Sequence, residues 1–192
     1  MKKILFSSAI IATMIFTGCG SSNKSVTPKA PQCQMDGASA PIWVCNGGEN
    51  MKGGIFAVAS AQKSPLGISF QRQEAMAAAR DEISRQINIK VKNMFKSYMS
   101  STGTGNAQTA ERVATSVSKQ LSYQTLRNSK LLNTWISPKG TMFVLVGIKG
   151  SIKNAVKQAA KTTLHNDEAL WQEFKAKKAQ EQLDSEIDKE FK

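Results

Sequence analysis

Three cysteines carry the most distinctive chemistry in this chain of 192 residues. Cys19 follows an apolar run, and Cys33 and Cys45 lie further along. A thiol can form a thioether, a disulfide or a metal thiolate. The last two cysteines and the single histidine, His165, have neither the number nor the spacing of zinc ligands, so we expect no metal site and no cofactor.

The first nineteen residues have the layout of an export signal. Lys2 and Lys3 precede thirteen uncharged residues, Ile4–Phe16. This run is too short for a membrane-spanning helix, which needs about 20 apolar residues, but it fits the apolar centre of a secretory signal peptide, of about 7–15 residues. A short buried helix is the alternative, and it would require the first residues of the chain to lie in a core.

Four residues resemble the lipobox of bacterial lipoproteins: Phe16, Thr17, Gly18 and Cys19. Phe16 and Thr17 depart from its usual Leu and Ala or Ser. The resemblance implies a signal peptide at residues 1–18 and a Cys19 that carries a thioether-linked diacylglycerol and a further chain such as palmitate. Two or three acyl chains hold a protein firmly on a bilayer. Residue 20 is Gly and not the Asp that marks inner-membrane retention, so we expect the protein at the outer membrane. It could lie on the periplasmic face or on the outer surface.

Cys33 and Cys45 are the thiols left after lipid attachment. An exported protein lies where disulfides persist, and a separation of twelve positions makes a comfortable loop. Such a bridge contributes roughly 3 kcal/mol in the chain-entropy description. The sequence therefore favours a Cys33–Cys45 disulfide, and two free buried thiols are the alternative.

The charge is unevenly distributed along the chain. Residues 19–166 carry 19 Lys and Arg against six Asp and Glu, a net +13, and residues 167–192 carry five against eight, a net −3. An exported, lipid-anchored protein does not meet the genome, so nucleic acid is excluded as a partner. Anionic head groups, peptidoglycan carboxylates or an acidic protein suit the basic body better, and an ordinary solvated surface is the alternative.

Composition divides the mature chain into three parts. The residues after Cys19 are rich in Ser, Lys and Pro and have little to bury, which predicts a tether over residues 19–39. We expect an α+β domain over residues 40–166 and a C-terminal amphipathic helix over residues 167–192. The apolar stripe of that helix is too thin to fold alone, so it should pack against the basic body or another copy.

Apolar periodicity predicts a small antiparallel sheet of about three strands packed against a long helix. The expected elements, in chain order, are a strand at 55–61, a helix from Ser69 as N-cap to Met99, a helix at 107–118, a bent or bulged strand at 120–136, a central strand at 141–148, a helix from Gly150, and a helix at 168–191 capped by Asn166 or Asp167. The first helix, about 45 Å long, exceeds what a compact domain needs. One use of that length is an end that projects toward a neighbouring subunit.

The chain resembles the family of small bacterial surface lipoproteins named for the twenty-kilodalton Helicobacter lipoprotein. The resemblance lies in three phrases behind the lipobox: APIWV at 40–44, QEAMAAARDEISRQI at 73–87 and GTMFVLVGIKG at 140–150. It implies a small α+β domain anchored at the outer membrane, with no catalytic residues to carry over. Because the family includes the motility lipoprotein FlgP, which assembles into rings or disks around the flagellar motor, it also implies a motility-associated, self-associating role.

Three classes of function follow. The first is a non-catalytic structural or assembly protein of the envelope, which forms a homo-oligomer or binds an envelope protein. The second is a binding module that engages peptidoglycan or a periplasmic synthase through the basic body. The third is an enzyme, which would need paired groups held in a pocket. The acids are scattered and His165 lies beside a helix cap, so we expect no enzyme and a capping or surface role for this histidine.

Overall fold

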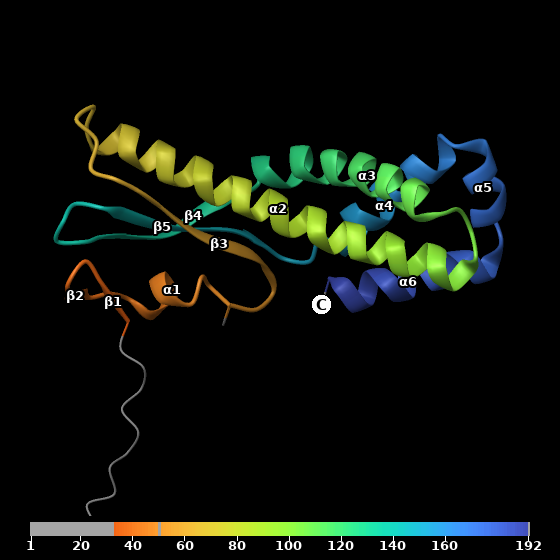
Figure 1. Ribbon diagram of the computed structural model, residues 1–192, viewed down its shortest axis with the longest axis horizontal. Helices are drawn as coiled ribbons and strands as arrows, with labels where there is room; N and C mark the ends of the chain where they lie inside the picture. The colour runs from red at the N-terminus through yellow and green to blue at the C-terminus, as the bar shows by residue number, and fades with distance from the viewer. Residues whose placement is uncertain (1–32, 50, 192) are drawn as a thin grey trace, which may run out of the picture. The chain divides into compact units, whose positions relative to one another are not determined.

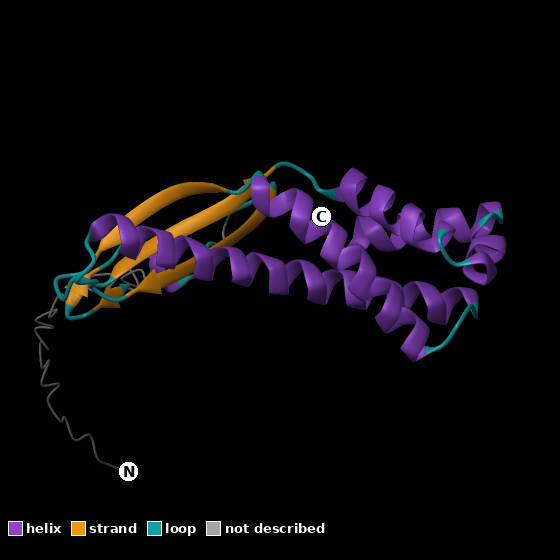
Figure 2. Ribbon diagram, turned by 90° about the horizontal axis from the view of Figure 1, so that it is seen from above, coloured by secondary structure: helices purple, strands orange, loops and turns teal. Residues whose placement is uncertain are grey.

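The computed structural model describes residues 33–49 and 51–191. The described part combines helices with two small antiparallel sheets, so the predicted α+β class is confirmed. Figures 1 and 2 show the strands gathered at the left and a group of helices at the right, with the helix α2 (Ile68–Thr102) running past both.

The larger sheet has three antiparallel strands, in the order β3 (Gly54–Ala61), β5 (Met142–Lys149) and β4 (Lys130–Ile136). The almost continuously apolar run at 141–148 is therefore the central strand, as predicted. Six of the eight residues of β5 are buried, which is the pattern of a strand covered on both faces.

The hairpin of β4 and β5 carries a bulge. Its turn closes with the Gly140 N–H donating to the carbonyl oxygen of Ser137 at 2.8 Å, as the Ser-Pro-Lys-Gly sequence predicts. The register shifts between Leu131 and Asn133, so one extra residue of β4 lies between them. Within the bent or bulged strand expected at 120–136, the irregularity thus lies between Leu131 and Asn133, and Asn128 caps the end of the preceding helix.

The long predicted helix is present as α2, whose 35 residues span about 52 Å. Its fully buried side chains recur three and four positions apart: Ala75, Ala79, Ile83, Ile87, Val91, Met94 and Phe95. The helix begins after Gly67, so the prediction of Ser69 as its N-cap is wrong. Burial continues to Met99 because neighbouring helices cover the second half. The second half of α2 therefore does not project from the domain.

The helix α3 (Ala107–Arg127) is longer than predicted. Residues 120–127 continue it, so the expectation that they begin a strand is wrong. Leu121 is fully buried and lies four residues after the buried Val117, whereas Tyr123 is 70% exposed. The apolar residues thus follow a helical stripe, which overrides their partial alternation.

Three further helices follow the sheet: α4 (Lys153–His165), α5 (Glu168–Phe174) and α6 (Lys177–Glu190). The single helix predicted at 168–191 is therefore two helices, because the backbone at Ala176 is extended, with a ψ of 131°. Asp167, one of the two predicted caps, accepts a hydrogen bond from the Leu170 N–H at 3.2 Å.

The acidic C-terminal helix packs within its own chain. α6 contacts α2 and α4, and its Leu183 is 1% exposed. Ion pairs join Lys153 to Asp188 and Lys157 to Asp184, each at 2.6 Å. Exposed pairs of this kind contribute about 0–1 kcal/mol each. The basic body thus receives this helix, as predicted, and its apolar stripe is covered without another copy.

Candidate functional site

The predicted lipid-attachment residue Cys19 and the cleavage motif of Phe16, Thr17 and Gly18 lie outside the described residues. The structure describes the region to which that segment leads, which begins at Cys33. Across residues 33–49 and 51–191, no helix has both the length and the apolar character needed to span a bilayer.

The described chain opens with a short hairpin of two strands: β1 (Gln34–Met35) and β2 (Ala38–Ser39). Asp36 and Gly37 form its turn with φ angles of 52° and 82°, as in a type I′ turn, for which Asp-Gly is a favoured pair. The Ala40 N–H donates to the carbonyl oxygen of Cys33 at 2.8 Å. Residues 33–39 were assigned to the tether, but the structure places them in the folded domain, whose described part starts before residue 40.

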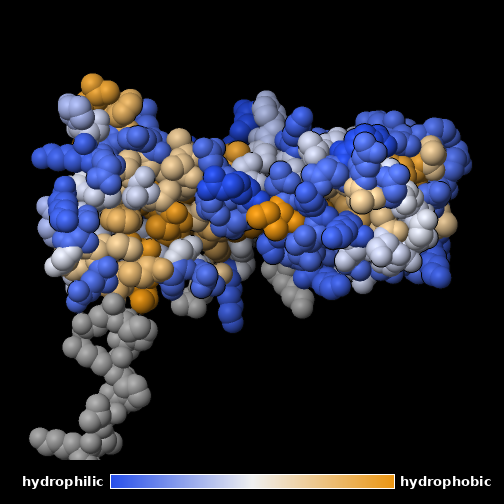
Figure 3. Space-filling view, in the orientation of Figure 1, coloured by the Kyte–Doolittle hydropathy of each residue, from blue (hydrophilic) through white to orange (hydrophobic). Residues whose placement is uncertain are grey.

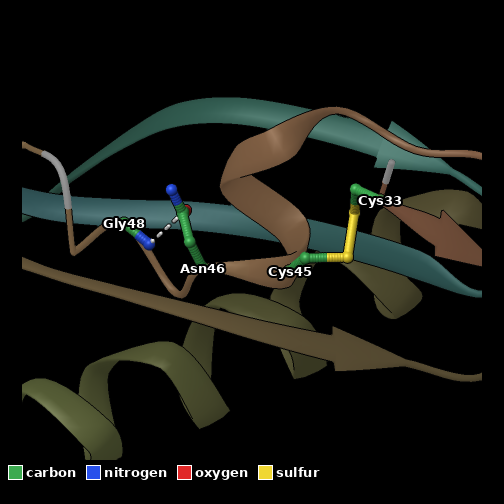
Figure 4. The surroundings of a disulfide bond; sticks show 4 residues. All are labelled: Cys33, Cys45, Asn46 and Gly48. Atoms are coloured by element: carbon green, nitrogen blue, oxygen red, sulfur yellow. Dashed lines mark hydrogen bonds between the residues drawn. A yellow bond between two sulfur atoms is a disulfide. The ribbon is translucent and has the colours of Figure 1, made fainter. Parts of the chain in front are cut away.

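Cys33 and Cys45 form a disulfide, with their Cα atoms 5.7 Å apart (Figure 4). Cys33 precedes β1, and Cys45 is the last residue of the short helix α1 (Ile42–Cys45). Next to the bridge, the side-chain oxygen of Asn46 accepts from the Gly48 N–H at 3.2 Å. The expected bridge is therefore present in the structure, and the alternative of two free thiols is not.

The residues 33–49, which we call the stapled segment, cover the face of the sheet opposite α2. Their buried Val44 belongs to a small cluster with Trp135 and Phe143, whose rings lie 5.5 Å apart between centroids. The side chains of β5 that alternate with Phe143 belong instead to the main core beneath α2: Met142, Val144, Val146 and Ile148. Because neighbouring residues of a strand point to opposite faces, the stapled segment and α2 enclose the sheet between them.

A glycine with a positive φ lies where the stapled segment touches the sheet. Gly48 has a φ of +83°, and a Cβ added to it would lie 3.2 Å from Cδ1 of Leu145 and 3.4 Å from Cβ of Phe56. Gly47 also has a positive φ, of +62°, but a Cβ there would have nothing within 4 Å. The backbone at Gly48 therefore rests on the sheet itself, and a side chain there would push on Leu145 and Phe56.

The hairpin turn of the stapled segment is tied to the β4–β5 turn. The hydroxyl of Ser137 donates to Oδ2 of Asp36. This hydrogen bond is the main reason that the pKa of Asp36 lies below its ordinary value of 3.8, and Thr141 and the charge of Lys139 act in the same direction.

The β4–β5 turn is tied in turn to the start of α2. The buried side chain of Gln71 donates through Nε2 to the carbonyl oxygens of Gly140, at 2.7 Å, and Ala61, at 3.0 Å. The β1–β2 turn, the β4–β5 turn and the first turn of α2 thus form one end of the domain, at the left in Figure 1.

The groups with shifted pKa values lie on separate elements. The hydrogen bond from Arg112 lowers the pKa of Asp167 at the start of α5. Burial, helped by the charge of Glu173, raises the pKa of Tyr98 on α2 to about 12. Asp36 lies in the β1–β2 turn. Acid–base catalysis would require such groups to lie close together, and these three do not.

His165 is an exposed residue at the end of α4, and its ring lies 4.6 Å from that of Trp171 between centroids. This position agrees with the expected capping or surface role. Within the part of the chain that the structure describes, no three His, Cys, Asp or Glu side chains are grouped so that they could hold a metal ion.

A surface pocket of about 360 Å³ lies where the ends of β3 and α4 approach the C-terminal helix. Two of its lining side chains are lysines that hold that helix. Lys90 donates through Nζ to the carbonyl oxygen of Glu190 at 2.8 Å and lies 5.8 Å from the centroid of the Phe191 ring. Lys153 pairs with Asp188. Both lysines at the pocket therefore stabilise the position of the C-terminal helix.

The family model described as LPP20 lipoprotein matches residues 41–149, more than half of the chain. The chain belongs to the LPP20 lipoprotein family. The expected resemblance is thus confirmed. LPP20 proteins are lipoproteins of the envelope and are not a known enzyme family. The LPP20 match begins within the stapled segment and ends with β5, so the β1–β2 hairpin and α4–α6 lie outside it. No curated protein matches the chain.

The stapled hairpin in front of the LPP20 match is the main feature that the sequence reasoning missed. A usable pattern was present, because Asp-Gly between short extended stretches is a strong indication of a two-residue hairpin turn. Asp36 and Gly37 stand at the required positions. Because the preceding residues have a low apolar content, the predicted tether includes the hairpin.

Proposed function

We propose that this chain is a lipid-anchored lipoprotein of the outer membrane with a non-catalytic structural or assembly role in the cell envelope. The observation that carries the proposal is an LPP20 domain whose match begins at residue 41, behind the lipobox-like Cys19 and 21 intervening residues. Acyl chains on this cysteine would attach the domain to a bilayer without a spanning helix. The Cys33–Cys45 disulfide supports an exported protein, because such bridges persist in oxidising compartments.

The stapled segment suits a domain that is held by its N-terminus. A pull on the anchored segment reaches the folded part at Cys33, which begins a hairpin of only two residue pairs. The bridge passes this load to Cys45 and so to α1, which packs against the central strand β5. A covalent link at the attachment point protects the hairpin from being peeled away.

Lipid attachment is tested by labelling cells with a palmitate analogue and by the mass of the N-terminal peptide. We expect the label and an acylated peptide that starts at Cys19. The Cys19→Ser variant should lose both while keeping its helix content. An unmodified mature cysteine, or a chain that keeps residues 1–18, would contradict the proposal.

The outer-membrane location has its own test. Membrane fractionation should find the wild-type chain with the outer membrane, whereas the Gly20→Asp variant should move to the inner membrane. The wild type and the Gly20→Asp variant should carry the same lipid, so the comparison tests membrane sorting independently of lipid attachment. Wild-type protein in the inner membrane would contradict this part of the proposal.

The assembly role divides into self-association and docking on an envelope protein. Sedimentation and crosslinking of the Cys19→Ser chain should reveal oligomers, and a strictly monomeric species at high concentration would exclude self-association. The proposed link to motility is tested by imaging the flagellar motor and measuring swimming in a deletion strain. An intact motor and normal swimming would remove that link.

A binding module for peptidoglycan or a periplasmic synthase is the second candidate. Residues 33–166 carry 17 Lys and Arg against six Asp and Glu, and the described ion pairs to α6 engage only Lys153 and Lys157 of this region. The domain thus keeps a positive surface for an anionic polymer. Pull-down on purified sacculi should then decrease as salt rises, and absence of binding at every salt concentration would remove this candidate.

A further inference from the structure

The start of α2 exposes three large apolar side chains within five residues. Leu66, Ile68 and Phe70, which we call the apolar tip, are 70%, 53% and 47% exposed. Gly67, with a φ of +94°, lies between the first two and is the N-cap of α2. Figure 3 shows hydrophobic surface at the upper left, where α2 begins in Figure 1.

The fold itself does not need apolar residues at these positions. The buried stripe of α2 begins with Gln71 and Ala75, and the apolar tip lies before this stripe or points away from it. Isolated exposed apolar residues such as Ile89, at 61%, occur on most protein surfaces. A group of three at the end of a helix is more unusual and indicates a contact outside the domain.

The apolar tip lies at the end of the domain from which the anchored segment departs. Hydrogen bonds from Ser137 to Asp36 and from Gln71 to Gly140 join the hairpin turn after Cys33 to the first turn of α2. Cys19 and Cys33 are fourteen positions apart, and a chain of that length spans at most about 50 Å. A lipid at Cys19 therefore keeps a bilayer within reach of this end.

The charges around the apolar tip also suit a lipid surface. Lys63 lies against Gly140, and exposed Arg72 and Lys139 occupy the first turns of α2 and the β4–β5 turn. The acids at this end are Asp36, which Ser137 engages, and Glu74. The small excess of positive charge favours anionic head groups but leaves most of the attraction to the apolar side chains.

The size of the patch argues for a bilayer over a second copy. Three half-exposed side chains offer on the order of 300 Å², whereas a stable protein interface buries roughly 800 Å² on each partner. A bilayer needs no matching surface, and apolar groups that enter by about 5–10 Å gain from leaving water.

We propose that the apolar tip inserts into the head-group region of the bilayer that holds Cys19, so that the domain is attached at two points. The inference rests on the proposed function for the presence of that bilayer, but the tip's own affinity for lipid does not depend on acylation. Two-point attachment fixes the end of the domain toward the membrane and turns the helices α3 to α6 away from it.

The first test uses the mature chain with Cys19→Ser and vesicles of phosphatidylethanolamine and phosphatidylglycerol in a 3:1 ratio. We expect the chain to co-sediment with the vesicles. The variant with Leu66→Ser, Ile68→Ser and Phe70→Ser should lose at least tenfold in partition. Ile89→Ser combined with Tyr123→Ser is the matched control, because these residues are 61% and 70% exposed outside the tip, and it should bind as the unsubstituted chain does.

The second test follows a label in the bilayer. An environment-sensitive fluorophore on Leu66→Cys should brighten and shift to the blue on vesicles, and brominated lipids should quench it. The same label on Ile89→Cys should change little. Circular dichroism of each variant checks that the helices are intact.

Several results would overturn the proposal. Equal binding by the triple variant would mean that the basic body, and not the apolar tip, contacts lipid. Absence of binding by the parent chain, or tip-dependent oligomers without lipid, would exclude a bilayer as the occupant. Each outcome is independent of the mass of the Cys19 peptide, so failure of the lipid anchor and failure of the tip are distinguished.

Discussion

The two faces of the sheet are covered in different ways. Beneath α2 lies a continuous apolar core to which α3, α4 and α6 also contribute. The opposite face is covered by the stapled segment, whose separate small cluster contains Cys33, Ala40 and Val44 as its buried members. Partly buried aromatic residues, including Trp43 and Trp135, complete it.

This difference shows how the domain stabilises a cover that is too short to hold by packing. Burial stabilises in proportion to the apolar area removed from water, so α2 needs no covalent link. The stapled segment buries few apolar side chains, and small folded units of this kind are usually held by disulfides. The Cys33–Cys45 bridge supplies that stability where the anchored chain joins the domain.

The largest expected effect comes from opening a cavity beneath α2. Ile87 is fully buried in the main core, so Ile87→Ala should lower the free energy of unfolding by about 2–5 kcal/mol. Urea denaturation followed by circular dichroism measures this change. Ile89→Ala on the same helix is the control, because Ile89 is 61% exposed and should change stability by about 0.5 kcal/mol or less. Similar losses in both variants would contradict the assigned burial.

The next effect tests the other face. Replacing Cys33 and Cys45 together by Ser removes a loop constraint worth about 3 kcal/mol. We expect the near-ultraviolet circular dichroism of Trp43 and the hydrogen-exchange protection of the residues around it to decrease first. The far-ultraviolet signal of the helices should persist without denaturant. If the helices unfolded together with the stapled segment, the two covers would not be held separately.

Sequence reasoning worked where one pattern determined an element and failed where two patterns competed. The apolar run of β5 fits only a central strand, and the apolar spacing from Ala75 to Val91 fits only a helix. Leu121, Tyr123 and Thr125 fit both a strand and a helix, and packing of α3 against α2 and α4 decides between them. That packing cannot be predicted from the local sequence.

The candidate site shows the same limit. Spacing and compartment were sufficient to predict the bridge between Cys33 and Cys45, because a disulfide depends on few contacts. The position of the stapled segment on the sheet could not be predicted in this way. It depends on contacts such as that of Gly48 with Leu145, which are nearly 100 residues apart along the chain.

A smaller effect isolates the contact between the stapled segment and the sheet. Gly48→Ala places a methyl group against Leu145 and Phe56 and also forces a positive φ on alanine. Gly47→Ala has only the backbone strain, of about 1 kcal/mol. We expect Gly48→Ala to destabilise by about 1 kcal/mol more, measured by urea denaturation. Equal losses would mean that the loop moves away from the sheet without cost.

The smallest effect concerns the hydrogen bond that ties the stapled segment to the β4–β5 turn. Because folding lowers the pKa of Asp36, its ionised form stabilises the fold above the ordinary pKa of 3.8, and this contribution disappears as the pH falls through the lower folded value. Asp36→Asn should therefore be slightly less stable than the wild type at pH 7 and equal to it near pH 2.

Urea midpoints measured from pH 7 to pH 2 follow this convergence, with Ser137→Ala as the matched control. That variant keeps the carboxylate but removes the hydroxyl that donates to it, so the main cause of the lowered pKa is lost. The pH-dependent part of its loss should match that of Asp36→Asn. A pH-independent loss should remain, because the Ser137 hydroxyl also accepts from the Thr141 N–H at 3.2 Å. A difference that stays constant at every pH would mean that the hydroxyl stabilises the turn through Thr141 and packing, and that its hydrogen bond to the Asp36 carboxylate contributes nothing to stability.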